Sequence, residues 1–151
     1  MSDHTPAVGG ASGLGYAGDV DCNEAWDILN RDAAAVLVDV RTVPEWDFVG
    51  VPDLGSISKQ TTLVQWQIYR EPSPNSEFLA GLGSANISKD ATVLFLCRSG
   101  ARSMSAAIAA TAAGYRTCYN IAGGFEGPPD GESHRGLVDG WKARGLPWEQ
   151  R

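Results

Sequence analysis

The chain has 151 residues, 43% of them hydrophobic and 20% charged, which are the proportions of a folded protein with one domain. Its 12 basic and 18 acidic residues give a net charge of −6, so nucleic acid is not expected as a partner. Two large domains, a fibrous repeat and wholesale disorder are excluded by the same figures.

The N-terminal segment carries little information about function. Residues 1–18 mix Gly, Ala, Ser and Thr with little apolar periodicity, which predicts a flexible leader before a domain at 19–151. The start lacks the basic and apolar regions of a signal peptide, and no apolar run approaches the ~20 residues that span a bilayer. We expect a cytoplasmic protein with no membrane partner.

The first elements of the domain are a helix and a strand. Asp21 and Glu24 have the spacing of a capping box, which predicts a helix to about Asn30. The apolar run 35–40 then predicts a strand that is covered on both faces, as in a parallel sheet.

The next segments predict three helices. Thr42 and Glu45 repeat the capping-box spacing before a short helix that runs through Phe48. The segments 62–69 and 77–82 predict two further helices, separated by prolines that cannot continue a helix.

The second half of the chain has the pattern of a βαβ unit. The run 91–96 predicts a buried strand, 103–113 a helix that ends at Gly114, and 116–121 another strand. Within the helix, residues at i, i+3, i+4 and i+7 form the expected buried face: Met104, Ala107, Ile108 and Thr111. We therefore predict an α/β fold with helices on both faces of a mostly parallel sheet.

The loop between that strand and that helix contains the strongest candidate for chemistry. Cys97 follows the strand directly, at the sheet edge where open parallel sheets bind ligands. Unpaired N–H groups and the positive end of the helix stabilise a thiolate over a thiol there. Arg98 and Arg102 add positive charge, and Gly100 permits the positive φ that turns backbone amides inward. The loop predicts a nucleophilic sulfur whose anionic adducts are held by amides.

The alternative for any cysteine is that it only packs in the core, because free cysteines are among the most buried residues. We expect packing alone for Cys22, beside the first helix, and for Cys118, inside a predicted strand. Three cysteines are an odd number in a chain with no export signal, so free thiols are predicted.

The loop from Cys97 to Ser103 reads Cys-Arg-Ser-Gly-Ala-Arg-Ser and resembles the active-site loop of rhodanese-like sulfurtransferases. Other matches to this family occur in the family's order: Leu37-Val38-Asp39-Val40-Arg41 with Glu45-Trp46, Asn120-Ile121-Ala122-Gly123-Gly124, and Gly140-Trp141 with Gly145-Leu146-Pro147. The resemblance covers about residues 20–148 and implies a rhodanese-like α/β fold around a parallel sheet.

The resemblance implies an enzyme that carries sulfur as a cysteine persulfide. Cys97 takes a sulfur from a small anionic donor such as thiosulfate and passes it to cyanide or to a thiol. Substrate binding then falls to the rest of the loop: Arg98, Ser99, Gly100, Ala101, Arg102 and Ser103. No metal or organic cofactor is implied. We expect a monomer, with a sulfur-carrier protein as a further candidate partner.

Two residues at the end of the strand 35–40 are expected to support this site. The resemblance implies that the Asp39 carboxylate braces the Cys97 loop and that Arg41 anchors the neighbouring helix through Glu45. An ordinary ion pair at the strand end is the alternative.

The chain departs from the family's pattern in one turn. Residues 50–55 lack the histidine that family members usually carry there, which removes no catalytic group that we can name. The insert 61–83 is a segment where specificity for a partner or substrate can reside.

Three other functions compete with sulfur transfer. Cysteine phosphatases and arsenate reductases of related folds place five residues between the cysteine and an arginine, whereas only four separate Cys97 from Arg102. A rhodanese-like binding or sulfur-carrier module is the non-enzyme alternative, although such modules often lose the cysteine. His134 is the one histidine near a candidate loop, and a cysteine–histidine dyad would define a different enzyme.

Overall fold

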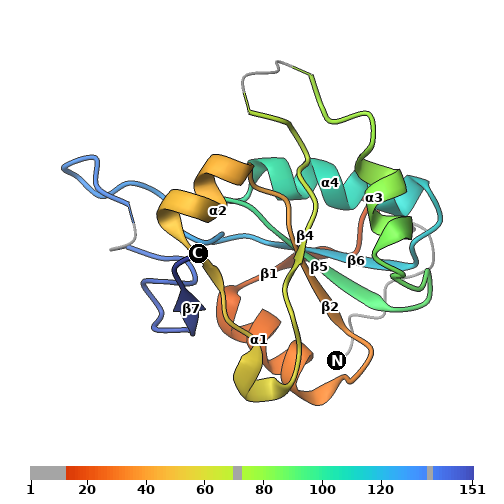
Figure 1. The fold of residues 1–151 in the computed structure, drawn as a ribbon, viewed down its shortest axis with the longest axis horizontal. Helices are drawn as coiled ribbons and strands as arrows, with labels where there is room; N and C mark the ends of the chain where they lie inside the picture. The colour runs from red at the N-terminus through yellow and green to blue at the C-terminus, as the bar shows by residue number, and fades with distance from the viewer. Residues whose placement is uncertain (1–12, 70–72, 136–137) are drawn as a thin grey trace.

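The computed structural model describes residues 13–69, 73–135 and 138–151. In these ranges the chain forms a five-stranded sheet of order β1-β6-β5-β2-β4 in which all neighbours are parallel (Figure 1). The strands are β1 (Gly18–Val20), β2 (Val36–Asp39), β4 (Thr62–Leu63), β5 (Thr92–Leu96) and β6 (Thr117–Ile121). The short strands β3 (Val51–Pro52) and β7 (Trp148–Glu149) form a separate antiparallel pair.

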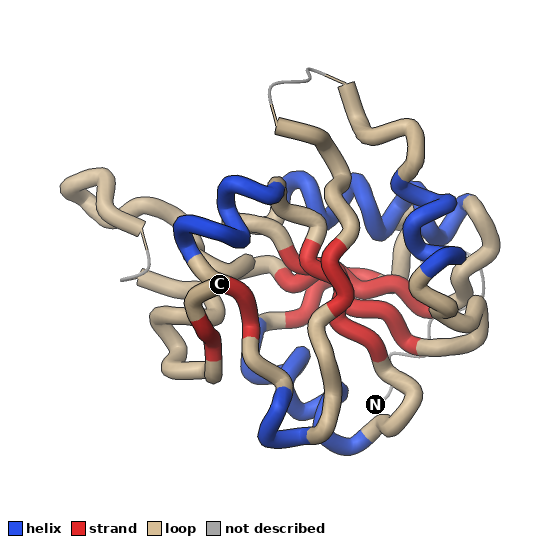
Figure 2. Tube along the Cα trace, in the orientation of Figure 1, coloured by secondary structure: helices blue, strands red, loops and turns tan. Residues whose placement is uncertain are grey.

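Helices cover both faces of the sheet. They are α1 (Cys22–Arg31), α2 (Val43–Val49), α3 (Phe78–Ser84) and α4 (Ala101–Ala112), with a 3-10 turn at Gly55–Ile57. Figure 2 shows α1 and the 3-10 turn on one side of the strands and α3 and α4 on the other. None of the helices in the described ranges is long and apolar enough to cross a membrane. The α/β architecture predicted from the sequence is confirmed.

The core has two layers because successive residues of a strand point to opposite faces of the sheet. On β5, Val93 and Phe95 pack with α3 and α4, whereas Leu94 and Leu96 pack with α1. All four side chains have no exposed surface. Cys97 continues the alternation and lies on the α4 side, just beyond the end of the strand.

The capping boxes that the sequence predicts are both formed. In α1, the side chain of Asp21 accepts the N–H of Glu24, and Glu24 accepts the N–H of Asp21. In α2, Thr42 and Glu45 make the same arrangement. These helices, α3 and the strands β2, β5 and β6 lie within two residues of their expected bounds.

Two predictions about secondary structure are wrong. The segment 62–69 is not a helix: Thr62 and Leu63 pair with β2 as the edge strand β4, and residues 64–69 form neither helix nor strand. The segment is only eight residues long, which is too short for a helix to be stable by itself, so tertiary pairing overrides its weak helical pattern.

The second error concerns the buried face of α4. Met104 and Ile108 are 38% and 40% exposed, while the buried side chains are small: Ser103, Ala106, Ala107, Ala110 and Thr111. Small side chains let the helix axis lie close to the sheet, so the larger apolar residues are turned outward. The predicted face is therefore correct for Ala107 and Thr111 and wrong for Met104 and Ile108.

The sheet also contains a strand that the sequence did not predict. Gly18–Val20 forms β1 and pairs with β6, and Tyr16 is buried against the α4 side of the core. The expected leader therefore includes residues that belong to the folded core, while its first twelve residues lie outside the described ranges.

Candidate active site

The candidate nucleophile lies where β5 ends and α4 begins. Only 1% of Cys97 is exposed, and three residues separate it from the first residue of α4, Ala101. Gly100 makes this short connection possible, because its φ of 123° is unfavourable for other residues. A Cβ at that position would also lie 2.7 Å from the carbonyl oxygen of Ala122. The predicted need for glycine here is thus both conformational and steric.

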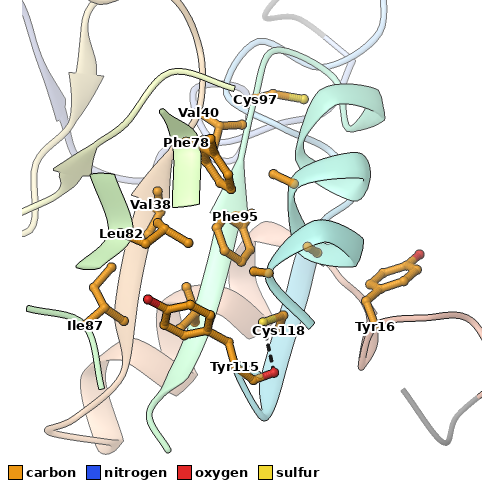
Figure 3. Close-up of a cluster of buried hydrophobic side chains, with 14 residues drawn as sticks. Tyr16, Val38, Val40, Phe78, Leu82, Ile87, Phe95, Cys97, Tyr115 and Cys118 are labelled. Carbon is orange, nitrogen blue, oxygen red and sulfur yellow. Dashed lines mark hydrogen bonds between the residues drawn. The ribbon is translucent and has the colours of Figure 1, made fainter. Parts of the chain in front are cut away.

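The sulfur of Cys97 has two hydrogen-bonding neighbours. The backbone N–H of Gly100 donates to Sγ at 3.1 Å, and the hydroxyl oxygen of Ser103 lies 3.1 Å from Sγ. Ser103 is fully buried, one turn into α4. The first N–H groups of a helix have no partner within it and carry its positive dipole end, so the N–H of Gly100 and this end of α4 favour negative charge on sulfur. Figure 3 shows Cys97 beside the first turn of α4.

A second loop holds the cysteine loop in place. The N–H of Phe125 donates to the carbonyl of Cys97 at 2.8 Å, and the N–H groups of Glu126 and Gly127 both donate to the carbonyl of Arg98 at 3.0 Å. A Cβ at Gly124 would overlap the backbone of Arg98, and its φ of 67° also favours glycine. The glycine pair after β6 therefore permits close contact between the two loops.

Arg102 is engaged with an acidic residue of α2. Its guanidinium donates to both carboxylate oxygens of Glu45, at 2.7 and 2.9 Å. Burial alone would raise the pKa of Glu45, but the hydrogen bonds and charge of Arg102 outweigh burial and lower it to about 2. Glu45 in turn raises the pKa of Arg102. Arg102 is thus a neutralised cation, whereas Arg98 is exposed.

Asp39 and Arg41 form a buried ion pair whose contacts differ from those expected. Both are fully buried, with 2.6 Å between Arg41 Nη2 and Asp39 Oδ2. Arg41 anchors α2 at its C-terminal end, through the carbonyl of Gly50, and not through Glu45. Its guanidinium also lies 4.2 Å from the centre of the Phe125 ring. The pair therefore reaches the cysteine loop indirectly, through the residue that binds the Cys97 carbonyl.

The other two cysteines are surrounded differently. Burial raises the pKa of Cys22 to about 12 and that of Cys118 to about 11. Each thiol lies within reach of a backbone carbonyl, that of Gly124 and that of Tyr115 respectively (Figure 3 shows the second). A carbonyl oxygen accepts a hydrogen bond from a thiol and cannot stabilise a thiolate. Cys22 and Cys118 therefore remain neutral thiols at pH 7.

A cavity of about 570 Å³ lies next to the cysteine loop. The cavity is lined by Arg98 and Arg102, by Glu126, and by the segment 67–69 after β4. Helix α2 and the residue before it contribute Thr42, Pro44, Glu45 and Val49. The insert singled out in the sequence thus supplies part of the wall. Cys97 lies beside this cavity and is not among its lining residues.

The site includes a residue to which the sequence assigned no role. Asn120 is a polar residue within the apolar strand β6, and only 2% of it is exposed. Its Oδ1 lies 2.5 Å from the hydroxyl of Ser103, so it is connected to Cys97 through one side chain. A polar residue at a position that faces the core was the available signal.

His134 is exposed, and its backbone binds Asp130 within the loop that follows Gly127. Within 13–69, 73–135 and 138–151, no three His, Cys, Asp or Glu side chains are grouped so that they hold a metal ion.

Comparison with known proteins identifies the family. A model of the STR4 middle domain matches residues 17–151. The chain belongs to the STR4 middle-domain family. Among curated proteins, the uncharacterized protein RC0915 of Rickettsia conorii is 40% identical over 126 residues, which are 83% of this chain and 92% of that protein. An uncharacterized Rickettsia montanensis protein in the dnaA 5' region gives the same figures.

Two solved structures resemble this member of the family. The crystal structure of Rv0390 from M. tuberculosis is 48% identical, with a TM-score of 0.83, and covers 90% of this chain and 99% of that one. The polysulfide-sulfur transferase homodimer from Wolinella succinogenes is 20% identical, with a TM-score of 0.63, covering 95% and 85%. At that identity the likeness shows the fold alone, and it agrees with the α/β fold expected from the sequence.

Proposed function

We propose that the protein is a sulfurtransferase that carries sulfur as a persulfide on Cys97. One observation carries the proposal: a buried sulfur at the end of a parallel strand is bound by the N–H of Gly100 at the start of α4. Such a site lowers the free energy of an anionic sulfur and leaves other thiols of the chain unaffected. The resemblance to rhodanese-like enzymes in the loop and in three other motifs points to the same reaction.

The proposed reaction has two steps. The Cys97 thiolate attacks the outer sulfur of thiosulfate, a new S–S bond forms, and sulfite leaves with the electron pair of the bond that breaks. Cyanide then attacks the terminal persulfide sulfur, thiocyanate leaves, and the Cys97 thiolate is restored. Charge is conserved in both steps, and neither requires a metal, an oxidant or an organic cofactor.

The cavity beside the loop suits a small anionic donor. Arg98 and Arg102 both line this cavity. Because Glu45 balances the charge of Arg102, Arg98 is the cation that remains to attract an anionic donor. Since only 1% of Cys97 is exposed, a donor must present a narrow sulfur atom to reach Sγ. Thiosulfate meets both requirements. Cyanide, a small thiol or the terminus of a sulfur-carrier protein are the proposed acceptors.

The position of Arg102 separates sulfur transfer from phosphatase or arsenate reductase chemistry. Those reactions need donors around the oxygens of a tetrahedral anion and an arginine for the charge that develops. Here the guanidinium of Arg102 is bound in a bidentate manner by Glu45, and the loop has one residue fewer. We infer that the loop accommodates a single sulfur and that aryl phosphates are not substrates.

A transfer assay tests the proposal. The protein is mixed with thiosulfate and cyanide, and thiocyanate formation is measured for the native chain, for Cys97→Ser and for Cys118→Ser. Turnover by the native chain and Cys118→Ser, with none by Cys97→Ser, is the expected result. Aryl phosphate hydrolysis that depends on Cys97, without any thiocyanate formation, would refute the proposal.

A further inference from the structure

A chain of four polar side chains connects the surface of β1 to the sulfur of Cys97. The hydroxyl of Tyr16 donates to Asp19 at 2.7 Å, and Nδ2 of Asn120 donates to the same carboxylate oxygen at 3.0 Å. Oδ1 of Asn120 lies 2.5 Å from Ser103 Oγ, which lies 3.1 Å from Cys97 Sγ. Asp19 and Asn120 are register partners on neighbouring parallel strands, so their side chains point to the same face of the sheet.

The carboxylate of Asp19 fixes the direction of every hydrogen bond in this chain. An ionised Asp19 only accepts, so Asn120 turns its NH₂ group toward Asp19 and its carbonyl oxygen toward Ser103. Burial, together with the hydrogen bond to Asp19, raises the pKa of Tyr16 to about 12, so that its hydroxyl remains a donor. Both neighbours of Asp19 therefore donate to it.

The hydroxyl of Ser103 has one proton and three acceptors within reach. They are Asn120 Oδ1 at 2.5 Å, Cys97 Sγ at 3.1 Å and the carbonyl of Gly100 at 3.2 Å. The shortest of these bonds takes the proton, and a lone pair of Oγ then faces the sulfur. In this arrangement the Cys97 thiol donates to Ser103, and the N–H of Gly100 is the one donor that the described residues offer to a thiolate.

We propose that Asp19 and Asn120 are positioning residues that direct the hydroxyl proton of Ser103 away from Cys97 and thereby favour its thiol over its thiolate. This inference depends on the proposed function only where it connects the reactivity of Cys97 to sulfur transfer. The chain of hydrogen bonds sets the reactivity of the sulfur whichever reaction it performs. Asp19 is exposed on β1, so the reactivity of a buried cysteine depends on a carboxylate at the surface.

Other charged groups around the cysteine loop remain unchanged in the test that follows. They are Arg98 in the loop, Arg102 on α4, Glu45 on α2, Glu126 after β6 and the Asp39–Arg41 pair at the end of β2. Any shift produced by the variants is thus assigned to the hydrogen-bonded chain or to the charge of Asp19 itself.

The substitution Asp19→Asn removes the carboxylate that fixes the direction of the chain. An amide at position 19 donates as well as accepts, so Asn120 is no longer held with its NH₂ group toward position 19 and can turn that group toward Ser103, which releases the hydroxyl proton to Cys97. The rate of Cys97 alkylation by iodoacetamide is measured against pH, with the modified peptide identified by mass. We expect the midpoint of this profile to fall by about one pH unit, which is roughly a tenfold gain in rate below the midpoint.

A double-mutant cycle separates the hydrogen bonds from the lost charge. The Ser103→Ala background lacks the hydroxyl that connects Asn120 to Cys97, so in that background Asp19→Asn is expected to leave the midpoint unchanged. An equal shift in both backgrounds would show that only the charge of Asp19 matters, and no shift in either would show that the chain has no effect. Both results overturn the proposal, and both are readable in a protein with no sulfurtransferase activity.

Asn120→Leu provides a second test that leaves Asp19 in place. Leucine has a similar volume and accepts no hydrogen bond, so Ser103 becomes free to donate to the sulfur. The midpoint is expected to fall, as with Asp19→Asn. An unchanged midpoint in a variant with a native circular dichroism spectrum contradicts the proposal.

Discussion

Cys97 and Cys118 belong to the same layer of the core, and the difference between them is the basis for proposing that only Cys97 is reactive. Both have at most 1% exposed surface and both pack on the α4 side of the sheet. Cys118 lies within β6 next to a backbone carbonyl, whereas Cys97 lies past the end of β5 next to a backbone N–H. Burial is equal, and the polarity of the neighbouring backbone is opposite. We therefore attribute the proposed chemistry of Cys97 to its place at the end of the strand and not to its depth in the core.

The largest expected effect is the difference in activity between a Cys97 variant and a Cys118 variant. Cys97→Ala should reduce thiocyanate formation by roughly 10³-fold or more, because no other group forms the persulfide. Cys118→Ala and Cys22→Ala should retain turnover, since their thiols stay neutral. Steady-state assays of the three variants check this. Loss of activity in a folded Cys118→Ala protein would remove the distinction between the two sites.

A side chain at Gly100 is expected to distort the loop that contains Cys97 and so to lower both stability and turnover. Gly100→Ala places a Cβ against the carbonyl of Ala122 at an unfavourable φ, so we expect about 2 kcal/mol of lost stability and a 10- to 100-fold loss of turnover. Urea denaturation and the transfer assay measure both. Gly83→Ala is the matched control: Gly83 has open space in α3 and should gain up to about 1 kcal/mol. Equal effects at the two glycines would contradict the loop geometry.

The ion pair beside the loop predicts a stability that depends on pH. The folded-state pKa of Glu45 is about 2 against an ordinary 4.5, so its charge stabilises the fold above pH 4.5, and this contribution is lost as the pH falls toward 2. Glu45→Gln should cost roughly 1–2 kcal/mol at pH 7 once solvent screening is allowed for, and almost nothing near pH 2.

Urea denaturation of both proteins across this pH range measures the difference. Asp47→Asn on the same helix is the control, because the pair of Asp47 with Arg151 is about half exposed and should contribute little at any pH. A Glu45→Gln penalty that is constant between pH 7 and pH 2 is incompatible with the Arg102 pairing.

The smallest expected effect concerns the exposed arginine. Arg98→Gln should raise the KM for thiosulfate two- to fivefold at low salt and leave kcat nearly unchanged, because Arg98 attracts the donor and takes no part in bond making. The difference should shrink as salt is added. Steady-state kinetics at two ionic strengths decide the point; a fall in kcat at constant KM would assign Arg98 to the reaction itself.

Much of this site could be predicted because its signals are local. The strand before Cys97, the helix after it and the glycine between them are adjacent in the sequence, and short connections leave few ways to arrange them. The capping boxes of α1 and α2 are likewise local, and both formed as expected.

The contacts that the sequence did not predict join residues that lie far apart along the chain. Glu45 binds a residue 57 positions away instead of Arg41, and Asn120 binds Asp19 across 101 positions. Pairing at such separations depends on how strands are ordered in the sheet and on the rotation of α4, and neither is encoded in a short pattern. The buried face of α4 was predicted only in part, since hydrophobicity favoured Met104 and Ile108 over the smaller residues Ser103, Ala106 and Ala110.

The most direct test of the account is to locate the sulfur. The native protein is treated with thiosulfate, and peptide mass spectrometry is used to ask which of its three cysteines gains a sulfur atom that cyanide then removes. We predict one added sulfur, on the peptide that contains Cys97, and none on the peptides that contain Cys22 or Cys118. A removable sulfur on either of those two peptides, or no sulfur on any of the three, would contradict the claim that the end of β5 is the reactive site.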